Sequence, residues 1–322
     1  MRPGGVLAVT PNPALDVTYR VPQLVPGRVH RVAEMAVRAG GKGVNVARVL
    51  HRLGAPCAVL GLGGGPGGAR LAAELEADGL DVRLVDALPD VRRTVVVHGA
   101  DGVTTSLWEP GPPPHDAAKA ERLLLDSVLT GLPDSGAVTV SGSLPVGVDP
   151  ELPLRVAALC AEHDVPVVLD LDGAPLRAAA TAGGAVLMPN EDELAALTGE
   201  RPDTPADAAR LATALLHTGP TAVVVATLGA RGIVAVGRAG AVHARLPSPV
   251  QGNPTGAGDA ACAAVARALA RAGSAAALDL RRMAVDAVAV SAASVLRPVA
   301  GDLDLAAYRR LTTEIVVEDP CR

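Results

Sequence analysis

The chain has 322 residues, of which 49% are hydrophobic and 20% charged, and its formal net charge is −5. This apolar content excludes a disordered chain, and no apolar run reaches the roughly 18 residues of a membrane-spanning helix. Slight acidity and scarce aromatic residues (no Phe, one Trp, two Tyr) disfavour a nucleic-acid binder. The N-terminal apolar stretch is too short for a signal peptide, and four scattered cysteines indicate neither a disulfide framework nor a zinc site. We therefore expect a cytoplasmic protein.

Short β-branched runs alternate with stretches rich in Ala and Leu along most of the chain. The predicted strands are 6–10, 57–62, 82–86, 137–142, 165–171, 185–188, 222–229 and 232–237. The predicted helices are 43–53, 67–78, 115–130, 150–163, 190–198, 205–217 and 257–272. Several strands are apolar throughout, which is typical of a parallel sheet covered by helices on both faces. The alternation predicts an α/β fold with a doubly wound, mostly parallel sheet.

Two segments, 16–38 and 92–108, have strand character without a helix inside them. In the second, Asp101 and Gly102 offer a two-residue hairpin turn. We interpret both segments as a small separate β-sheet, inserted into one domain that spans residues 1–322. Such a sheet serves as a lid or as an oligomerisation surface. The alternative is an antiparallel edge of the main sheet.

The strongest local motif is the sequence NPTGAGD at 253–259, which precedes an alanine-rich helix. Gly256 and Gly258 permit a tight turn, whose backbone N–H groups and helix dipole together bind an anion. Asp259 in the first helical turn would oppose a bound phosphate unless it takes a proton from an attacking hydroxyl group. The alternative is an ordinary helix capped by this carboxylate.

A second glycine cluster, GGKGVN at 40–45, also leads into a helix. It is not a Walker A loop, because Gly43 follows Lys42 and position 36 holds no glycine. A ligand could still approach the backbone here, with Lys42 and Asn45 as polar groups. A plain turn before a helix is the alternative.

A third cluster meets the dinucleotide-binding pattern GxGxxG. Gly63, Gly65 and Gly68 lie between a predicted strand and a predicted helix, and Asp86 ends the next strand. This pattern leaves open an oxidoreductase that uses a nicotinamide dinucleotide. Against it stand the position in the second βα unit and the frequency of such matches in a glycine-rich chain.

Several acidic and basic side chains follow predicted strands, where the sites of α/β proteins usually lie. Asn190 and Glu193 could organise Mg²⁺ around nucleotide phosphates, or they could form a capping box. Asp170 and Asp172 end another strand and are either site residues or caps. The pair at 92–93, both Arg, could neutralise a phosphate or lie on a solvated edge.

In this order, the motifs resemble the ribokinase/PfkB superfamily of sugar kinases, and within it the branch of 1-phosphofructokinases and tagatose-6-phosphate kinases. The resemblance runs from residue 6 to about residue 300 and implies a ribokinase-like fold with a β-sheet lid. The matching segments are 10–21, 40–54, 61–68, 92–94, 109–112, 141–148, 188–194, 227–232 and 254–260. It also accounts for the glycines at 61–68, which the family carries without binding a dinucleotide there.

The resemblance assigns one group of residues to phosphoryl transfer and the nucleotide. It implies that Asp259 is the catalytic base. The implied anion hole consists of Gly256, Ala257 and Gly258. The implied nucleotide contacts are Asn190, Thr227, Gly229 and Gly232, with Glu193 holding Mg²⁺ through water. ATP and Mg²⁺ are the implied cofactors, and a monovalent cation is left open.

The resemblance assigns a second group of residues to the sugar. The implied contacts to sugar hydroxyls are Asp16, Gly41 and Asn45, and those to the phosphate of the acceptor are Lys42, Arg93 and Ser141. The implied partners are a sugar phosphate and ATP, and the implied assembly is a homodimer formed through the lid, without nucleic acid or membrane.

The implied activity is ATP-dependent phosphorylation of a ketohexose phosphate, namely fructose 1-phosphate, fructose 6-phosphate or tagatose 6-phosphate, to a bisphosphate. Met188 departs from the branch, which usually has Lys there, and Thr227 replaces a common Ser. A kinase of a free sugar or nucleoside is the nearest alternative. A sugar-phosphate sensor on a kinase scaffold is the alternative without catalysis.

Overall fold

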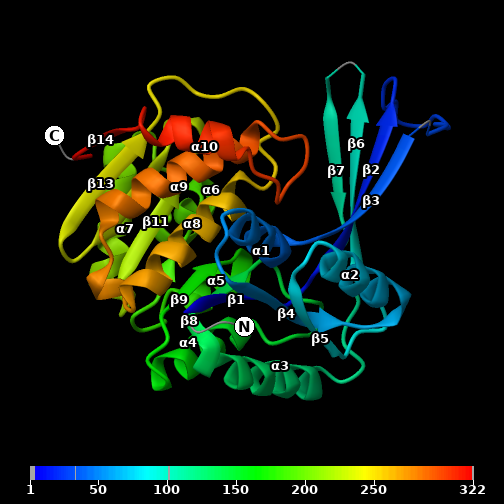
Figure 1. Cartoon of the computed structure of the whole chain (residues 1–322), viewed down its shortest axis with the longest axis horizontal. Coiled ribbons are helices and arrows are strands. Elements are labelled where there is room, and N and C mark those ends of the chain that lie inside the picture. The colour runs from blue at the N-terminus through cyan, green and yellow to red at the C-terminus, as the bar shows by residue number, and fades with distance from the viewer. Residues whose placement is uncertain (1–3, 33, 101, 321–322) are drawn as a thin grey trace.

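The computed structural model describes residues 4–32, 34–100 and 102–320. Its main sheet has the order β14-β13-β12-β11-β10-β9-β8-β1-β4-β5 (Figure 1). The strands from β5 to β11 are parallel, and β12, β13 and β14 continue the sheet antiparallel at one edge. Their bounds are β1 Gly5–Thr10, β4 Cys57–Gly63, β5 Asp81–Asp86, β8 Ser135–Ser141, β9 Val167–Asp170, β10 Val186–Leu187, β11 Val223–Thr227, β12 Ile233–Gly237, β13 Gly240–Arg245 and β14 Val316–Glu318. The predicted mostly parallel sheet is confirmed.

Helices cover both faces of this sheet. The α-helices are α1 Lys42–Arg52, α2 Gly65–Ala77, α3 Ala117–Gly131, α4 Leu152–Glu162, α5 Gly173–Ala179, α6 Glu191–Thr198, α7 Pro205–Thr218, α8 Ala257–Ala272, α9 Leu280–Val295 and α10 Leu305–Thr312, and the short 3₁₀ helices are η1 Leu132–Asp134, η2 Gly229–Arg231 and η3 Ala275–Ala277. On one face α1, α2, α8, α9 and α10 share a core. On the other face α3, α4 and α5 pack together, and α6 and α7 form a smaller cluster over β11 and β12.

The alanine content of α8 explains how this core forms without phenylalanine. Ala260, Ala261, Ala263, Ala264 and Ala266 are fully or almost fully buried. Small side chains let α8 approach β8, α1 and α9 closely, so that its N-terminus reaches the carboxyl ends of the central strands. The alternation of elements does not predict α5, α9, α10, β13 or β14, because the neighbouring strands and helices supply their packing and pairing.

The second sheet has four strands in the order β3-β2-β6-β7 and extends away from the main body (Figure 1). Its bounds are β2 Ala14–Val21, β3 Glu34–Gly40, β6 Arg92–Gly99 and β7 Thr104–Trp108. We call these four strands the lid sheet. The predicted small separate sheet is confirmed, and the alternative of an edge of the main sheet is wrong. In the predicted hairpin turn, Gly102 has φ +83°, whereas Asp101 lies outside the described residues.

The chain itself fills the turn that matches the dinucleotide pattern. A Cβ at Gly64 would lie 1.7 Å from the carbonyl oxygen of Leu88, and one at Gly65 would lie 2.3 Å from that of Pro89. The Gly67 N–H donates to Asp90 Oδ1 at 2.9 Å, so a side chain satisfies this donor at the start of α2. The glycines are there because the 86–91 segment packs directly on the turn, which leaves no place for a pyrophosphate. No helix among the described residues is long and apolar enough to span a bilayer.

Candidate active site

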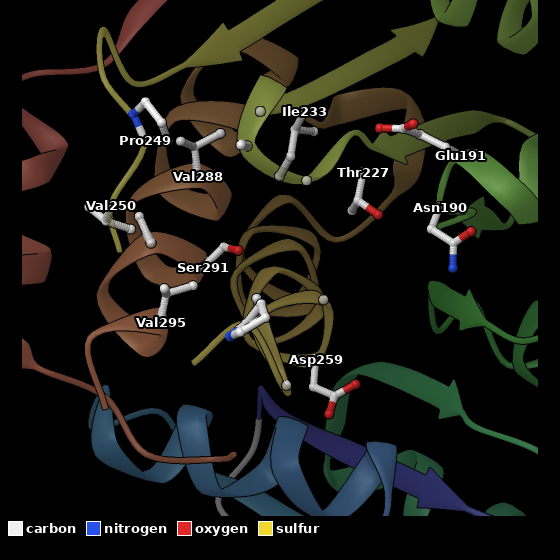
Figure 2. Close-up of a pocket in the computed structure, with 18 of the residues that line it drawn as sticks. Asn190, Glu191, Thr227, Ile233, Pro249, Val250, Asp259, Val288, Ser291 and Val295 are labelled. Atoms are coloured by element: carbon white, nitrogen blue, oxygen red, sulfur yellow. The ribbon is translucent and has the colours of Figure 1, made fainter. Parts of the chain in front are cut away.

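A cavity of about 820 Å³ lies at the carboxyl ends of β9, β10 and β11, between η2, α9 and the N-terminus of α8 (Figure 2). Residues more than 200 positions apart in the sequence contribute to its wall. The predicted site residues that line it are Lys42, Asn190, Glu193, Thr227, Gly229, Gly232, Gly256, Ala257, Gly258 and Asp259. The five predicted residues that do not line it are Asp16, Gly41, Asn45, Arg93 and Ser141.

The N-terminus of α8 is a glycine turn followed by a buried carboxylate. Gly256 has φ +81° and precedes the first helical residue, and a Cβ there would lie 2.7 Å from Ala300 Cβ. Asp259 is 7% exposed, and Asn45 Nδ2 donates to its Oδ2 at 2.8 Å. Burial and the nearby Asp170 carboxylate raise the pKa of Asp259 to about 7, against the lowering effects of Lys42 and Asn45. The group can therefore exchange a proton near neutral pH.

Lys42 connects the start of α1 to two carboxylates on other elements. Its Nζ lies 3.0 Å from Asp170 Oδ1, at the end of β9, and 4.0 Å from Glu193 Oε1, on α6. Burial lowers the pKa of Lys42, but the charges of Asp170 and Glu193 outweigh this effect and the pKa is raised. Lys42 is therefore a permanent cation of this cavity.

Asn190 and Glu193 form the capping box that their spacing allows. Asn190 Oδ1 accepts from the Glu193 N–H at 2.9 Å, and Glu193 Oε2 accepts from the Asn190 N–H at 2.8 Å. Burial raises the pKa of Glu193, with Lys42 and the Asn190 N–H acting against it. Although they cap α6, both residues also line the cavity, and Glu193 Oε1 faces Lys42.

The polar end of the cavity bears on whether Mg²⁺ fits this site. Among the described residues, no group of three or more His, Cys, Asp or Glu side chains is arranged to hold a metal ion. Asp170 and Glu193 nevertheless present carboxylate oxygens to the cavity. One or two carboxylates suit Mg²⁺, because this ion keeps several waters and takes further oxygens from substrate phosphates.

An apolar wall faces the polar end of the cavity, and the sequence motifs do not predict it. Ile233, Val250, Val288 and Val295 belong to this wall, with Ser291 among them (Figure 2). The segment 246–252, which precedes the glycine turn of α8, also contributes to the lining of the cavity. Four apolar or small residues at helical spacing in 288–295 are the only local signal, and they equally fit a core helix.

Gly232 follows η2 beside this wall, at a position where the backbone requires glycine. It has φ +91°, and a Cβ there would lie 2.1 Å from the carbonyl oxygen of Ala244. Thr227 ends β11, and its backbone forms an isolated bridge with Asn190. The apolar wall and these two residues line a part of the cavity that suits an apolar or aromatic group.

Asp16 lies at the junction of the lid sheet and the main body. Thr94 donates its hydroxyl proton to Asp16, and a Cβ at Gly40 would lie 2.0 Å from Asp16 Oδ2. Burial raises the pKa of Asp16, while the Thr94 hydroxyl and the Arg92 guanidinium act against this rise. Gly41 has φ +102° and caps α1 next to this carboxylate.

The two arginines of the predicted pair differ in their surroundings. Arg92 donates to the carbonyl oxygens of Asn12 at 3.1 Å and of Glu109 at 3.2 Å. Arg93 is exposed, and its backbone N–H donates to Glu109 Oε2 at 2.7 Å. Within the described residues the Arg93 side chain makes no hydrogen bond, whereas that of Arg92 supports the loop that follows β7.

Ser141 is fully enclosed at the end of β8. It is 1% exposed, and its Oγ lies 3.8 Å from Cys262 Sγ on α8. Burial raises the pKa of the Cys262 thiol well above its ordinary value, so this thiol stays neutral. In this structure Ser141 supports the contact between β8 and α8.

Sequence motifs missed a group of arginines around this junction. Arg48 on α1 is 4% exposed and pairs with Glu74 at 3.0 Å and with Asp78 at 2.9 Å. Arg38 on β3 donates to the carbonyl oxygen of Ala300 at 2.9 Å. Ala300 packs on Gly256, so Arg38 links the lid sheet to the loop beside the anion site.

Comparison with known proteins places this chain in a family. A family model described as "pfkB family carbohydrate kinase" matches residues 12–305. The chain is 34% identical over 271 residues to a 1-phosphofructokinase of Xanthomonas campestris pv. campestris, covering 82% of this chain and 83% of the relative. It is 36% identical over 267 residues to a 1-phosphofructokinase of Rhodobacter capsulatus, with the same coverage.

The fold has a solved counterpart. Phosphofructokinase-2 from Escherichia coli, in a structure described as a complex with potassium, superposes with a TM-score of 0.88 at 26% identity, covering 97% of this chain and 99% of that chain. The chain therefore belongs to the pfkB family of carbohydrate kinases. It is a phosphotransferase with a ribokinase-like fold, as the sequence motifs imply.

Proposed function

We propose that this chain transfers the γ-phosphoryl group of ATP to a hydroxyl group of a ketohexose phosphate and so makes a bisphosphate. Two relatives named 1-phosphofructokinase support fructose 1-phosphate as the first acceptor to test. Fructose 6-phosphate and tagatose 6-phosphate remain candidates, because each is also a ketohexose that carries one phosphate group.

The observation that carries this proposal is the position of Asp259. Its buried carboxylate lies in the first turn of α8, three residues from the positive-φ glycine that opens the helix. Backbone N–H groups at a helix N-terminus bind an anion, and the carboxylate beside them has a pKa of about 7. A phosphoryl group and a proton acceptor are thereby brought next to each other.

In the proposed reaction, Asp259 orients the attacking hydroxyl group and accepts its proton. The backbone N–H groups of Gly256, Ala257 and Gly258 stabilise the charge on the transferred phosphoryl oxygens. Asn45 holds the Asp259 carboxylate in place through its 2.8 Å hydrogen bond. The apolar wall and the Thr227, Gly229 and Gly232 region hold the adenine and ribose.

Asn190 and Glu193 are the residues proposed to organise Mg²⁺, Glu193 acting through water. When bound, the ion neutralises phosphate charge and orients the oxygens for in-line transfer. The neighbouring structure whose description includes potassium supports adding K⁺ to the assay.

The phosphate of the acceptor is proposed to bind near Lys42, Arg93 and Ser141, with Asp16, Gly41 and Asn45 holding the sugar. Arg93 is the most exposed of these side chains and lies on the lid sheet, beside the junction that contains Asp16. A cation there would distinguish a sugar phosphate from a free sugar.

The test measures ADP release with ATP, Mg²⁺ and K⁺ on fructose 1-phosphate, fructose 6-phosphate, tagatose 6-phosphate, free hexoses, ribose and nucleosides. We expect turnover on the phosphorylated sugars alone. Arg93→Ala should raise KM for the phosphorylated acceptor about tenfold with little change in kcat, because it removes a charge-assisted contact. An unchanged KM for the phosphorylated acceptor, or a fall in kcat alone, would contradict the assignment of Arg93.

A kinase of a free sugar or nucleoside is a second candidate, and one observation favours it. The Lys42 ammonium is already paired with Asp170, and the Arg93 side chain does not line the cavity. The two cations therefore do not converge on one phosphate here. Turnover confined to unphosphorylated acceptors would select this candidate. The absence of ADP release with every acceptor would favour a sugar-phosphate sensor.

A further inference from the structure

The cavity holds more negative than positive side chains. Its carboxylates are Asp170, Glu191, Asp192, Glu193 and Asp259. Within the described part of the chain, the cations that line it are Lys42 and Arg201. Lys42 is already committed to Asp170 and Glu193. A triphosphate that enters this cavity meets repulsion unless a cation of the protein faces it as well as its metal ion.

Arg201 follows α6 and lies at the solvent side of the cavity. Its Nη1 pairs with Asp192 Oδ1 at 2.5 Å, and its Nη2 lies 3.9 Å from Glu191 Oε2. The Arg201 side chain is 61% exposed and that of Asp192 is 77% exposed. Water screens an ion pair this exposed, so the guanidinium can leave Asp192 at little cost.

Arg201 is not needed to neutralise Glu191, because Arg231 already does so. Arg231 Nη2 lies 2.8 Å from Glu191 Oε2, and the same guanidinium donates to the carbonyl oxygens of Asp203 and Pro202. Figure 2 shows Glu191 extending from α6 toward η2, the turn that contains Arg231. Arg231 therefore has the structural role, and Arg201 has a weak exchangeable partner.

We propose that Arg201 is a nucleotide-binding residue, whose guanidinium leaves Asp192 and binds phosphate oxygens of the nucleotide. This inference rests on the proposed function, since it needs a nucleotide in this cavity. A guanidinium offers two parallel N–H groups that match two phosphate oxygens. Asp192 then acts as a competing anion that limits the affinity for ATP.

The test is calorimetric titration of the full chain with ATP and with adenosine, in the presence of Mg²⁺. Arg201→Ala should weaken ATP binding about tenfold and leave adenosine binding unchanged, because adenosine has no phosphate. Arg201→Lys should retain part of the affinity, since it keeps the charge but loses the paired N–H groups. Asp192→Asn should strengthen ATP binding, because it removes the competing anion.

Arg210→Ala is the matched control. Arg210 on α7 is 55% exposed and pairs with Glu200 and Asp207, but it does not line the cavity. Its loss should leave both affinities unchanged. Thermal unfolding of each variant checks that α6 and its surroundings remain folded.

Two results would overturn the inference: the same ATP affinity in Arg201→Ala and Arg210→Ala, or an equal loss for ATP and adenosine. The second result would indicate a distorted cavity rather than a lost phosphate contact. If the unmodified chain binds no nucleotide, the proposed function fails and the inference fails with it. If it binds ATP regardless of residue 201, the inference alone fails.

Discussion

At the scale of single residues, a carboxylate buried beside a phosphate site is costly unless its environment controls its charge. Asp259 has this position, with Asn45 donating to it and Lys42 among the nearby charges. Its pKa is about 7 rather than the ordinary 3.8, because burial and Asp170 oppose ionisation. Reactivity near neutral pH and a loss of stability thus have the same cause.

Replacing Asp259 by Asn should remove most turnover, by about 10²- to 10⁴-fold, because an amide cannot accept the proton. At pH values above 7, the same change should also raise the midpoint temperature of thermal unfolding. Folding raises the pKa of Asp259, so the folded chain binds the proton more tightly than the unfolded chain. The stability that protonated Asp259 contributes is therefore lost as pH rises from about 4 to about 7, and the neutral variant avoids this loss.

Turnover and calorimetric unfolding at pH 5 and pH 8 check this prediction. The midpoint difference should be largest at pH 8, where about 1 kcal/mol corresponds to roughly 1.5 °C for a chain of this length. Unchanged turnover would refute the role of Asp259 as the base. A lower midpoint than that of the native chain at pH 8 would refute the argument from burial.

At the scale of elements, the turn before α8 shows how backbone geometry creates the anion site. Gly256 has φ +81°, and its missing Cβ is where Ala300 packs. The loop that contains Ala300 is fastened by Arg38 from the lid sheet and by Arg297, which pairs with Asp302 at 2.8 Å. The helix start therefore depends on a loop more than 40 residues further along the chain.

Gly256→Ala should lower the thermal midpoint, because an L residue at this φ costs about 1–2 kcal/mol and its Cβ would press on Ala300. Gly258→Ala is the matched control for stability. Gly258 is helical, and a Cβ there would meet nothing within 4 Å. Alanine favours a helix over glycine by about 1 kcal/mol, so this variant should unfold at the same temperature or higher. Equal midpoints for the two variants would contradict the steric argument.

At the scale of the whole molecule, the lid sheet presents an apolar row that the chain does not cover completely. Cross-strand register aligns Leu107, Val95, Val17 and Val37 across all four strands. Leu107 is 60% exposed, and Met35 in the adjacent row is 61% exposed. We propose that a second copy of the chain packs on this face and forms the homodimer, since an exposed apolar face of a sheet favours association.

Leu107→Asp should convert the dimer to a monomer, because it would bury a charge without a partner in the interface. Light scattering on a sizing column measures this directly, since one chain has a mass of 32.3 kDa. Leu129→Asp is the control, because Leu129 is also exposed, at 41%, but lies on α3 in the main body. A native chain that is already monomeric, or equal effects of both changes, would overturn the proposal.

The sequence by itself determined the features that depend on short segments. Alternating β-branched and alanine-rich runs predict the parallel sheet, and strict glycine positions predict the turns before α1 and α8. These features are readable because steric limits on φ, hydrophobic periodicity and helix capping act within a few residues. The same local rules produced the dinucleotide pattern at 63–68, which the structure shows to be a packing site for the 86–91 segment.

The tertiary structure decided which of these segments meet. Asn45 and Asp259 are 214 positions apart, and Lys42 and Asp170 are 128 positions apart, yet each pair is hydrogen bonded. Their contacts require the order of strands in the sheet and the close packing of α8. The arginines around the lid junction and the exposed pair of Arg201 with Asp192 have no local signature, and the helical spacing in α9 does not distinguish a cavity wall from a core helix. They exist because long-range packing sets the burial and the charge around each side chain.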